Sequence, residues 1–177
     1  RDAFFLLIQQ GFLLVRPQRA TLVSKISKEA VSQASFVRQS LELACLQEAC
    51  VKATSADLAA LEQNLAEQKA AVDAQDSATF HVLDDAFHQH ICRIAGRYFV
   101  WSLITDHKGH LERMRLLSLP GNGPRAYGDH CQIFYALRDG NLAQSERALR
   151  QHLGQILEIF DTTATENPDY FAPAIDA

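Results

Sequence analysis

The sequence predicts an all-α protein, an antiparallel helical bundle of about six helices preceded by a short β-hairpin. Apolar residues recur at helical spacing from Lys28 to Thr165. Cap and break sequences divide that stretch into helix-length segments, which is typical of a bundle with short loops. Two short apolar runs before Lys28 flank a basic turn. The 177 residues suffice for one sizeable domain, and no segment approaches the roughly 18 apolar residues of a membrane span.

Residues 1–27 are predicted to form the end of a helix followed by a hairpin. The stretch RDAFFLLIQQ has a helical apolar pattern and is stopped by Gly11. The apolar runs Phe12–Val15 and Thr21–Val23 flank RPQRA, which predicts a β-hairpin with a basic tip. An isolated hairpin of this length is only marginally stable. We therefore expect residues 1–27 to be the C-terminal part of a domain whose N-terminal part is missing from this chain.

Residues 28–165 are predicted to form the helical body. The caps and breaks that divide it are Thr54-Ser55, Asp76-Ser77, Gly96, the PGNGP sequence at 120–124, and Gly140. The expected helices span 28–52, 55–73, 77–95, 98–118, 124–139 and 141–161. Residues 166–177 are expected to be a loose tail.

Charge is unevenly distributed along the chain. The formal net charge is −4 at pH 7, which excludes a polycation of the nucleic-acid-coating type. Residues 1–30 carry five basic and two acidic side chains, a net charge of +3, so the remaining residues carry −7. A basic N-terminal segment followed by an acidic remainder indicates that the two parts have separate functions. A chance distribution of charge is the alternative.

The cysteines and the first residues of the chain indicate the cellular compartment. Cys45, Cys50, Cys92 and Cys131 lie in apolar helical settings and form no CxxC pair. Reduced, buried thiols of a cytoplasmic protein are the expectation. The charged Arg1-Asp2 start leads directly into an amphipathic helix, so no signal peptide is expected.

Three of the expected helices place metal-binding side-chain types on an apolar face. Asp84 and His88 are four residues apart and lie at the edge of one apolar stripe. His130 and His152 lie near the centres of two other stripes. A buried, unpaired carboxylate is costly and needs a cation or strong donors. These four residues therefore predict either a metal site or a hydrogen-bonded polar cluster.

The donor types favour a divalent metal with open coordination positions. Asp84 and the three imidazoles provide three nitrogens and one oxygen, which leaves room for water or an anion on the metal. Cys92 lies one turn after His88 and fits a small buried hydrophobe better than a soft ligand.

The 28–52 helix adds a candidate anion receptor. Arg38 and Glu42 are four residues apart on its apolar stripe. A buried arginine can bind a carboxylate bidentately. A plain ion pair between Arg38 and Glu42 is the equal alternative.

The 98–118 helix adds three further polar candidates. His107 and His110 lie near its apolar stripe and Arg113 lies at the edge. Each could line the same cavity, and packing or a solvated edge is the alternative. We include His110 and Arg113 with Arg38 and Glu42 as candidate effector-binding residues.

The chain resembles the GntR-type transcriptional regulators of the FadR/VanR-like branch. Arg1 to Gln10 resemble the tail of the recognition helix of a winged helix-turn-helix, and Gly11 to Ser24 resemble its wing. The body resembles the FCD ligand-binding domain. The matching pieces are Arg38-x3-Glu42, Asp84-x2-Phe87-His88, Ala95-Gly96, Asp129-His130, Asp139-Gly140 and His152.

This resemblance implies a homodimeric DNA-binding regulator rather than an enzyme. A divalent metal, zinc or nickel, would be bound by Asp84, His88, His130 and His152. The metal would help hold a small organic acid effector that changes the affinity for operator DNA. Arg1, Arg16 and Arg19 would contact DNA in the intact protein, whereas the present chain should bind DNA poorly. No membrane partner is implied.

Two positions depart from the family pattern, and two other function classes stay open. Arg97 stands where the family usually has Asn, and Asp129 stands where Glu is more common. The first alternative is a metal-dependent hydrolase or oxygenase, with Glu42 or His110 as general base. The second is a metal-free helical interaction domain.

Overall fold

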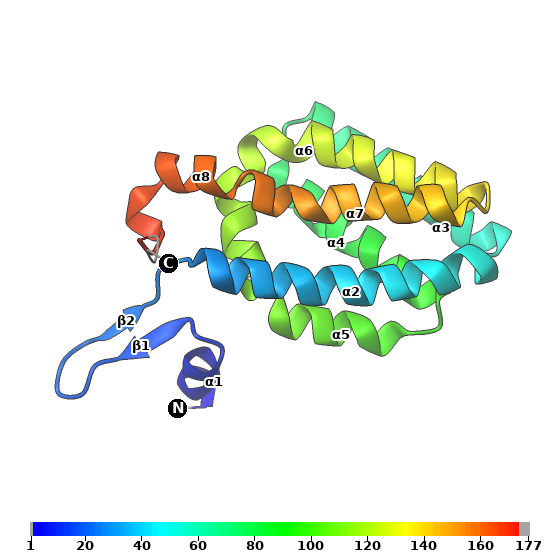
Figure 1. Ribbon diagram of the computed structural model, residues 1–177. Coiled ribbons are helices and arrows are strands. Elements are labelled where there is room, and N and C mark those ends of the chain that lie inside the picture. Colours follow the sequence, from blue (N-terminus) through cyan, green and yellow to red (C-terminus); the bar gives the residue numbers. More distant parts are fainter. Residues whose placement is uncertain (1, 174–177) are drawn as a thin grey trace.

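The computed structural model describes residues 2–173, apart from the side chains of residues 119–121, and confirms the predicted all-α class. Six helices form the bundle: α2 (Lys28–Lys52), α3 (Ser55–Asp73), α4 (Ser77–Ile94), α5 (Tyr98–His107), α6 (Gly109–Arg138) and α7 (Leu142–Glu158). In Figure 1, α2, α6 and α7 run lengthwise through the bundle, and α5 lies alongside α2. The hairpin extends from the end where α2 begins.

The first three bundle helices begin where cap chemistry predicts. The Ser27 hydroxyl accepts a hydrogen bond from the Ala30 amide, 3.0 Å away. Thr54 and Asp57 form a reciprocal capping box. The Asp76 carboxylate accepts from the Thr79 amide at 3.0 Å. These caps satisfy amides that have no intrahelical partner, so the helix starts are fixed locally.

The predicted division of the next segment is wrong. The expected 98–118 helix is two helices, because Lys108 is both the C-cap of α5 and the N-cap of α6. The expected break at 120–124 lies inside α6, which bends in Figure 1 where its colour passes from green to yellow. A bend lets a helix accommodate helix-breaking residues without ending. The break falls instead at Lys108, and α6 begins at Gly109, where the ring of Phe12 occupies the space that a Cβ would need.

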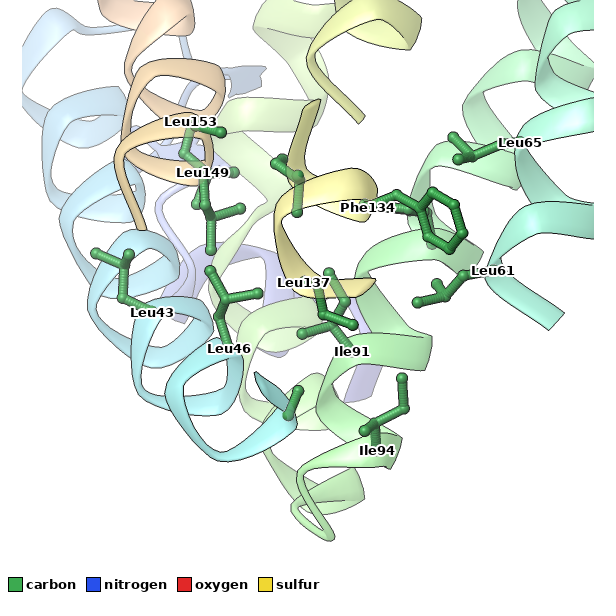
Figure 2. Close-up of a cluster of buried hydrophobic side chains, with 14 residues drawn as sticks. Leu43, Leu46, Leu61, Leu65, Ile91, Ile94, Phe134, Leu137, Leu149 and Leu153 are labelled. Carbon is green, nitrogen blue, oxygen red and sulfur yellow. The ribbon is translucent and has the colours of Figure 1, made fainter. Parts of the chain in front are cut away.

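The main core lies between α2, α3, α4, α6 and α7. Figure 2 shows leucine, isoleucine and phenylalanine side chains from these helices meeting in one cluster. Leu46, Leu61 and Leu149 in this cluster have no solvent-exposed surface. Burial of these apolar side chains holds the helices together and so fixes the positions of the polar residues beside them.

The N-terminal segment forms the predicted helix end and hairpin. Helix α1 (Asp2–Gln9) ends before Gly11, which has a φ of 76°. Strands β1 (Leu13–Val15) and β2 (Thr21–Val23) pair antiparallel, with Leu13 opposite Val23. No residue of α1 is buried. This segment therefore contributes little to the core.

The C-terminal segment is more ordered than predicted. Helix α7 ends at Glu158 rather than 161, and it is followed by α8 (Phe160–Glu166) and the 3₁₀ turn η1 (Pro168–Tyr170). Phe171 is 5% exposed and packs edge-on against Phe160, with 5.2 Å between ring centroids. The loose-tail prediction fails here because these aromatic side chains find a buried partner, and residues 174–177 lie outside the described part. Within the described part, no helix is long and apolar enough to cross a membrane.

Candidate metal centre

Four side chains from three helices converge at one point in the bundle. Asp84 and His88 come from α4, His130 from α6 and His152 from α7, and one ligand atom of each lies within 4.8 Å of all the others. The Nε2 atom of His152 is 3.2 Å from Nε2 of His88 and 3.2 Å from Nε2 of His130. The Oδ1 atom of Asp84 is 3.6 Å from Nε2 of His130. The predicted four residues are thus brought together.

The other ring nitrogen of each histidine faces an oxygen acceptor. Nδ1 of His88 is 2.6 Å from Oε2 of Glu42. Nδ1 of His130 is 2.8 Å from Oε1 of Gln68.

The third histidine has the same arrangement. Nδ1 of His152 is 3.4 Å from Oδ2 of Asp129. With the proton on Nδ1 of each ring, the three Nε2 lone pairs would be directed at one another. Such second-sphere acceptors are characteristic of metal-binding imidazoles.

Burial and neighbouring charges set the protonation states that a metal requires. Burial, together with the neighbouring His152, holds the pKa of His130 well below its usual value. Burial likewise lowers the pKa of His152. Although burial opposes ionisation of Asp84, the Arg115 guanidinium and the imidazoles hold its pKa well below the usual range. Neutral imidazoles and an ionised carboxylate are the forms that coordinate a cation.

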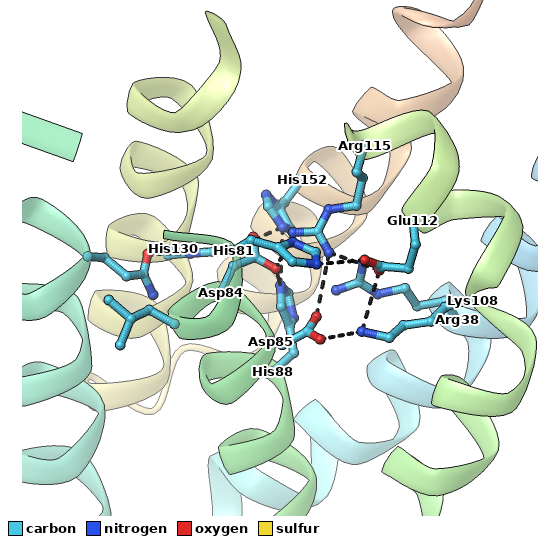
Figure 3. A network of polar contacts seen from close by, with 12 residues as sticks. Arg38, His81, Asp84, Asp85, His88, Lys108, Glu112, Arg115, His130 and His152 are labelled. Carbon is cyan, nitrogen blue, oxygen red and sulfur yellow. Dashed lines mark hydrogen bonds and ion pairs between the residues drawn. The ribbon is translucent and has the colours of Figure 1, made fainter. Parts of the chain in front are cut away.

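A polar network continues from Asp84 toward the junction of α5 and α6 (Figure 3). Nη2 of Arg115 is 2.7 Å from Oδ2 of Asp84, and Nη1 is 3.3 Å from Oε1 of Glu112. Lys108 pairs with Asp85 and lies 3.4 Å from Glu112. The network therefore connects the histidine cluster with the first residue before α6.

A pocket of about 80 Å³ opens beside the cluster. Its charged and imidazole lining side chains are Arg38, Asp84, Arg115 and His152. Nε of Arg38 donates to Oε1 of Glu42 at 2.6 Å, whereas the buried Nη2 of Arg38 has no hydrogen-bond partner among the described residues. Its lining also includes apolar side chains, namely Phe80, Leu111, Leu153, Ile156 and Ile159.

The predicted effector-binding residues separate into two groups. Arg38 lines the pocket, and Glu42 lies behind it as the partner of both Arg38 and His88. His110 and Arg113 lie outside the pocket. Nε2 of His110 is 3.2 Å from the Gln10 carbonyl oxygen, and Nη2 of Arg113 donates to the Ser24 carbonyl at 2.6 Å.

The break between α5 and α6 explains why His110 and Arg113 do not line the pocket. The prediction placed them by extending one helical phase from residue 98 to residue 118. Because a new helix begins at Gly109, that phase does not continue. His107 is exposed, with Nδ1 2.8 Å from the Leu103 carbonyl oxygen, and Cys92 packs with Cys45 in an apolar cluster.

The predicted DNA-contacting arginines lie far from the pocket in sequence and structure. Arg16 and Arg19 are exposed in the turn that joins β1 to β2, and the Arg19 amide donates to the Arg16 carbonyl at 3.0 Å. Arg1 lies outside the described residues. The hairpin tip therefore presents two unburied cationic side chains.

Sequence reasoning missed Arg115 and Gln68, although both carried a usable signal. Arg115 is four residues after the buried Leu111, so it lies on the same inward face of α6. Gln68 is three residues after Leu65 on the buried stripe of α3 and is itself fully buried. Both positions would have been found by treating polar residues on apolar stripes alike, whatever their type.

Comparisons with known proteins agree in both sequence and fold. The family model described as the FCD domain matches residues 33–155. The chain is 37% identical over 176 residues to the HTH-type transcriptional repressor RspR of Escherichia coli, covering 97% of this chain and 76% of RspR. It is 29% identical over 159 residues to the HTH-type transcriptional regulator LutR of Bacillus subtilis, covering 86% of this chain and 71% of LutR.

Solved structures share the fold at low sequence identity. Escherichia coli McbR/YncC superposes with a TM-score of 0.74 at 19% identity, covering 91% of this chain and 78% of that chain. A GntR protein of Streptococcus agalactiae superposes with a TM-score of 0.62 at 21% identity, covering 89% and 80%. These likenesses concern the arrangement of the helices alone.

Proposed function

The chain belongs to the GntR-type transcriptional regulators that carry an FCD domain, and we propose from this premise that a divalent metal and a small carboxylate effector control its operator binding. Residues 28–165 would form the metal- and effector-binding domain. Residues 1–27 would be the C-terminal part of a winged helix-turn-helix domain. The working form would be a cytoplasmic homodimer, as the resemblance implies.

One observation carries the metal assignment. Three Nε2 atoms and the Asp84 carboxylate gather within 4.8 Å of one another, and the Nδ1 atom of each imidazole lies close to an oxygen of Glu42, Gln68 or Asp129. With the proton on Nδ1, the Nε2 lone pairs would repel one another without a cation. Zinc or nickel suits three imidazoles and one carboxylate, held here by Asp84, His88, His130 and His152. When bound, such a metal supplies a positively charged centre that attracts an anion.

Charge around the ligand set also favours a cation. Besides Asp84 itself, the carboxylates of Glu42 and Asp129 lie against His88 and His152. The Arg115 guanidinium lies against Asp84, and Arg38 pairs with Glu42. These three carboxylates outnumber the two guanidinium groups, so a bound cation would balance the remaining negative charge.

The proposed effector site adjoins the metal site. Arg38 lines the pocket and its buried Nη2 has no hydrogen-bond partner among the described residues, so a carboxylate that reached this guanidinium would satisfy a buried donor that otherwise costs free energy. Arg115 is a second cationic neighbour. His110 and Arg113 are not part of this proposed effector site, because both contact the hairpin segment.

Helix α6 offers a physical connection between the pocket and the hairpin. It carries His130 of the proposed metal site, and near its start it carries His110 and Arg113, which contact residues 10–24. An effector that favours one position of α6 over another would change the population of hairpin orientations. Arg16 and Arg19 would then meet DNA phosphates or the minor groove.

Elemental analysis of the purified protein tests the metal proposal. We expect about one divalent metal ion per chain, lost in a His130→Ala/His152→Ala variant and retained in a His107→Ala control. Absence of metal from the wild type after reloading with zinc, nickel and manganese would refute the site. Operator binding is then tested on the longer natural protein, where no shift of any operator fragment with or without candidate acids would refute the regulatory role.

A further inference from the structure

We propose that Gln68 and Asn64 of α3 are positioning residues of the metal centre, which hold His130 in the tautomer that presents Nε2 to a metal ion. This inference rests on the proposed function, because it concerns how one ligand of the same site is held. It follows from a series of hydrogen bonds that joins the Leu83 carbonyl, Asn64 and Gln68 to His130, here called the amide relay.

The amide relay begins on the backbone of α4. Nδ2 of Asn64 donates to the Leu83 carbonyl oxygen at 3.1 Å, and Leu83 directly precedes the proposed ligand Asp84. A carbonyl oxygen can only accept a hydrogen bond. The side of the Asn64 amide that faces Leu83 must therefore be the NH₂ group, which leaves Oδ1 of Asn64 for another donor.

Gln68 takes its orientation from Asn64. Nε2 of Gln68 donates to Oδ1 of Asn64 at 2.7 Å, and Oε1 of Gln68 is 2.8 Å from Nδ1 of His130. A flipped Gln68 amide would place two oxygens against each other at Asn64 and an NH₂ group against His130. The backbone carbonyl thus fixes both amides so that an oxygen acceptor faces His130.

This acceptor determines the tautomer of His130. An amide oxygen has no proton to donate, so the hydrogen bond to Gln68 requires the proton on Nδ1 of His130. In the neutral ring Nε2 is then unprotonated, and it is the atom that lies 3.2 Å from Nε2 of His152. Glu42 and Asp129 face the other two histidines with carboxyl groups, which can themselves carry a proton. Of these three acceptors, Gln68 is the one that fixes a tautomer by itself.

Packing holds the plane of the same ring. His130 is fully buried and stacks on Phe87, with 4.6 Å between ring centroids and 19° between the planes. Gln68 is fully buried as well, so water cannot replace a hydrogen bond that its amide loses. Stacking on Phe87 and the bond to Gln68 together direct Nε2 toward the other ligands. Helix α3, which provides none of the four proposed ligands, therefore helps to form the metal centre.

Long-range proton–nitrogen NMR spectroscopy of the metal-free protein tests the tautomer. We expect His130, assigned by its absence from the spectrum of His130→Ala, to carry its proton on Nδ1 in the wild type and to lose this signature in Gln68→Met. Methionine is similarly unbranched but offers no oxygen acceptor. Gln63→Met is the matched control, because Gln63 is exposed on the same helix and donates to Glu67, and it should leave the His130 signal unchanged.

Zinc titration measures the consequence for the metal. The dissociation constant should rise about 10–100-fold in Gln68→Met, as expected for the loss of a histidine's outer partner, and stay unchanged in Gln63→Met. Asn64→Asp and Asn64→Leu test the direction of the amide relay, since aspartate keeps an acceptor for Nε2 of Gln68 and leucine does not. We expect zinc binding about tenfold weaker in Asn64→Leu than in Asn64→Asp.

The inference is wrong if wild-type His130 carries its proton on Nε2, or if a folded Gln68→Met variant keeps the wild-type spectrum or the wild-type zinc affinity. Circular dichroism checks folding, and the wild-type spectrum and the two Asn64 variants decide the question if Gln68→Met unfolds. A wild type that shows the Nδ1 proton but binds no zinc would support the amide relay and refute the metal part of the proposed function.

Discussion

The N-terminal segment and the helical bundle have similarly apolar sequences, but their apolar side chains differ in solvent exposure. Phe4 and Phe5 of α1 are 59% and 60% exposed, and most of the hairpin is exposed as well. Leu46 and Leu149 of the bundle are fully buried. The bundle encloses its apolar side chains with its own helices. The N-terminal segment instead makes a few contacts near the junction of α5 and α6, so the bundle supplies most of the buried core and the proposed DNA-contacting residues lie outside it.

Those few contacts are concentrated at the start of α6. The Phe12 ring lies against Gly109 and stacks on His110, with 4.6 Å between ring centroids. Arg113 holds the Ser24 carbonyl. The same short stretch begins with Lys108, the end of the polar network that reaches Asp84. The start of α6 therefore connects the polar network of the proposed metal site with the contacts that position the hairpin.

The largest expected effect comes from removing core volume in the bundle. Leu149→Ala should lower the free energy of unfolding by about 2–5 kcal/mol, because a fully buried leucine leaves a cavity. Leu6→Ala, at a position 55% exposed, should change it by less than about 0.5 kcal/mol. Urea unfolding measures both. Equal losses would mean that the two regions form one cooperative core.

The second expected effect concerns Glu112, in the polar network near the junction of α5 and α6. Burial opposes ionisation of Glu112, but His81, Arg115 and Lys108 lower its pKa to about 2. A depressed carboxylate pKa stabilises the fold above the unfolded-state value and loses that contribution as pH falls toward 2. The difference in unfolding free energy between wild type and Glu112→Gln should be about 1–3 kcal/mol at pH 7 and shrink below pH ~4.5.

Urea unfolding between neutral pH and the lowest pH at which both proteins still fold measures this difference. Glu158→Gln is the control, because Glu158 forms an exposed pair with Arg125 and should show a far smaller, nearly pH-independent difference. A Glu112→Gln difference that does not decrease at low pH would contradict an ionised Glu112 in the network.

The third effect is local rather than global. Gly109→Ala should displace the Phe12 ring and loosen residues 12–24, while the free energy of unfolding of the bundle changes by no more than about 1 kcal/mol. Hydrogen exchange of the hairpin amides should accelerate. Gly128→Ala is the control, since no atom lies within 4 Å of the Cβ that it would add. Unchanged hairpin exchange would show that the Phe12 contact does not hold this segment.

Local chemistry made much of this molecule predictable. Ser27, Thr54 and Asp76 fix helix starts through neighbouring amides, so the first three bundle helices follow from the sequence. The four inward metal-ligand types could be predicted because polar residues on an apolar stripe are conspicuous.

Contacts between distant segments were not predictable in the same way. The Phe12 ring lies against Gly109 at the start of α6, although the two residues are far apart in sequence. The order of the tail likewise depends on Phe171 meeting Phe160. A helical wheel extended across such a break assigns His110 and Arg113 to the wrong side, whereas the hairpin contacts show where they lie.

The smallest expected effect on stability is also the sharpest test of the N-terminal segment. Arg16→Ala/Arg19→Ala should leave the free energy of unfolding within about 0.5 kcal/mol of wild type, because both side chains are exposed. In the longer natural protein the same change should weaken DNA binding and reduce its salt dependence by about one unit of slope per lost phosphate contact. Arg147→Ala/Arg150→Ala removes the same charge from exposed positions of α7. If DNA binding is weakened equally in both variants, the hairpin arginines act only through net charge. A loss of DNA binding confined to the hairpin variant assigns DNA contact to the segment that contributes least to the fold.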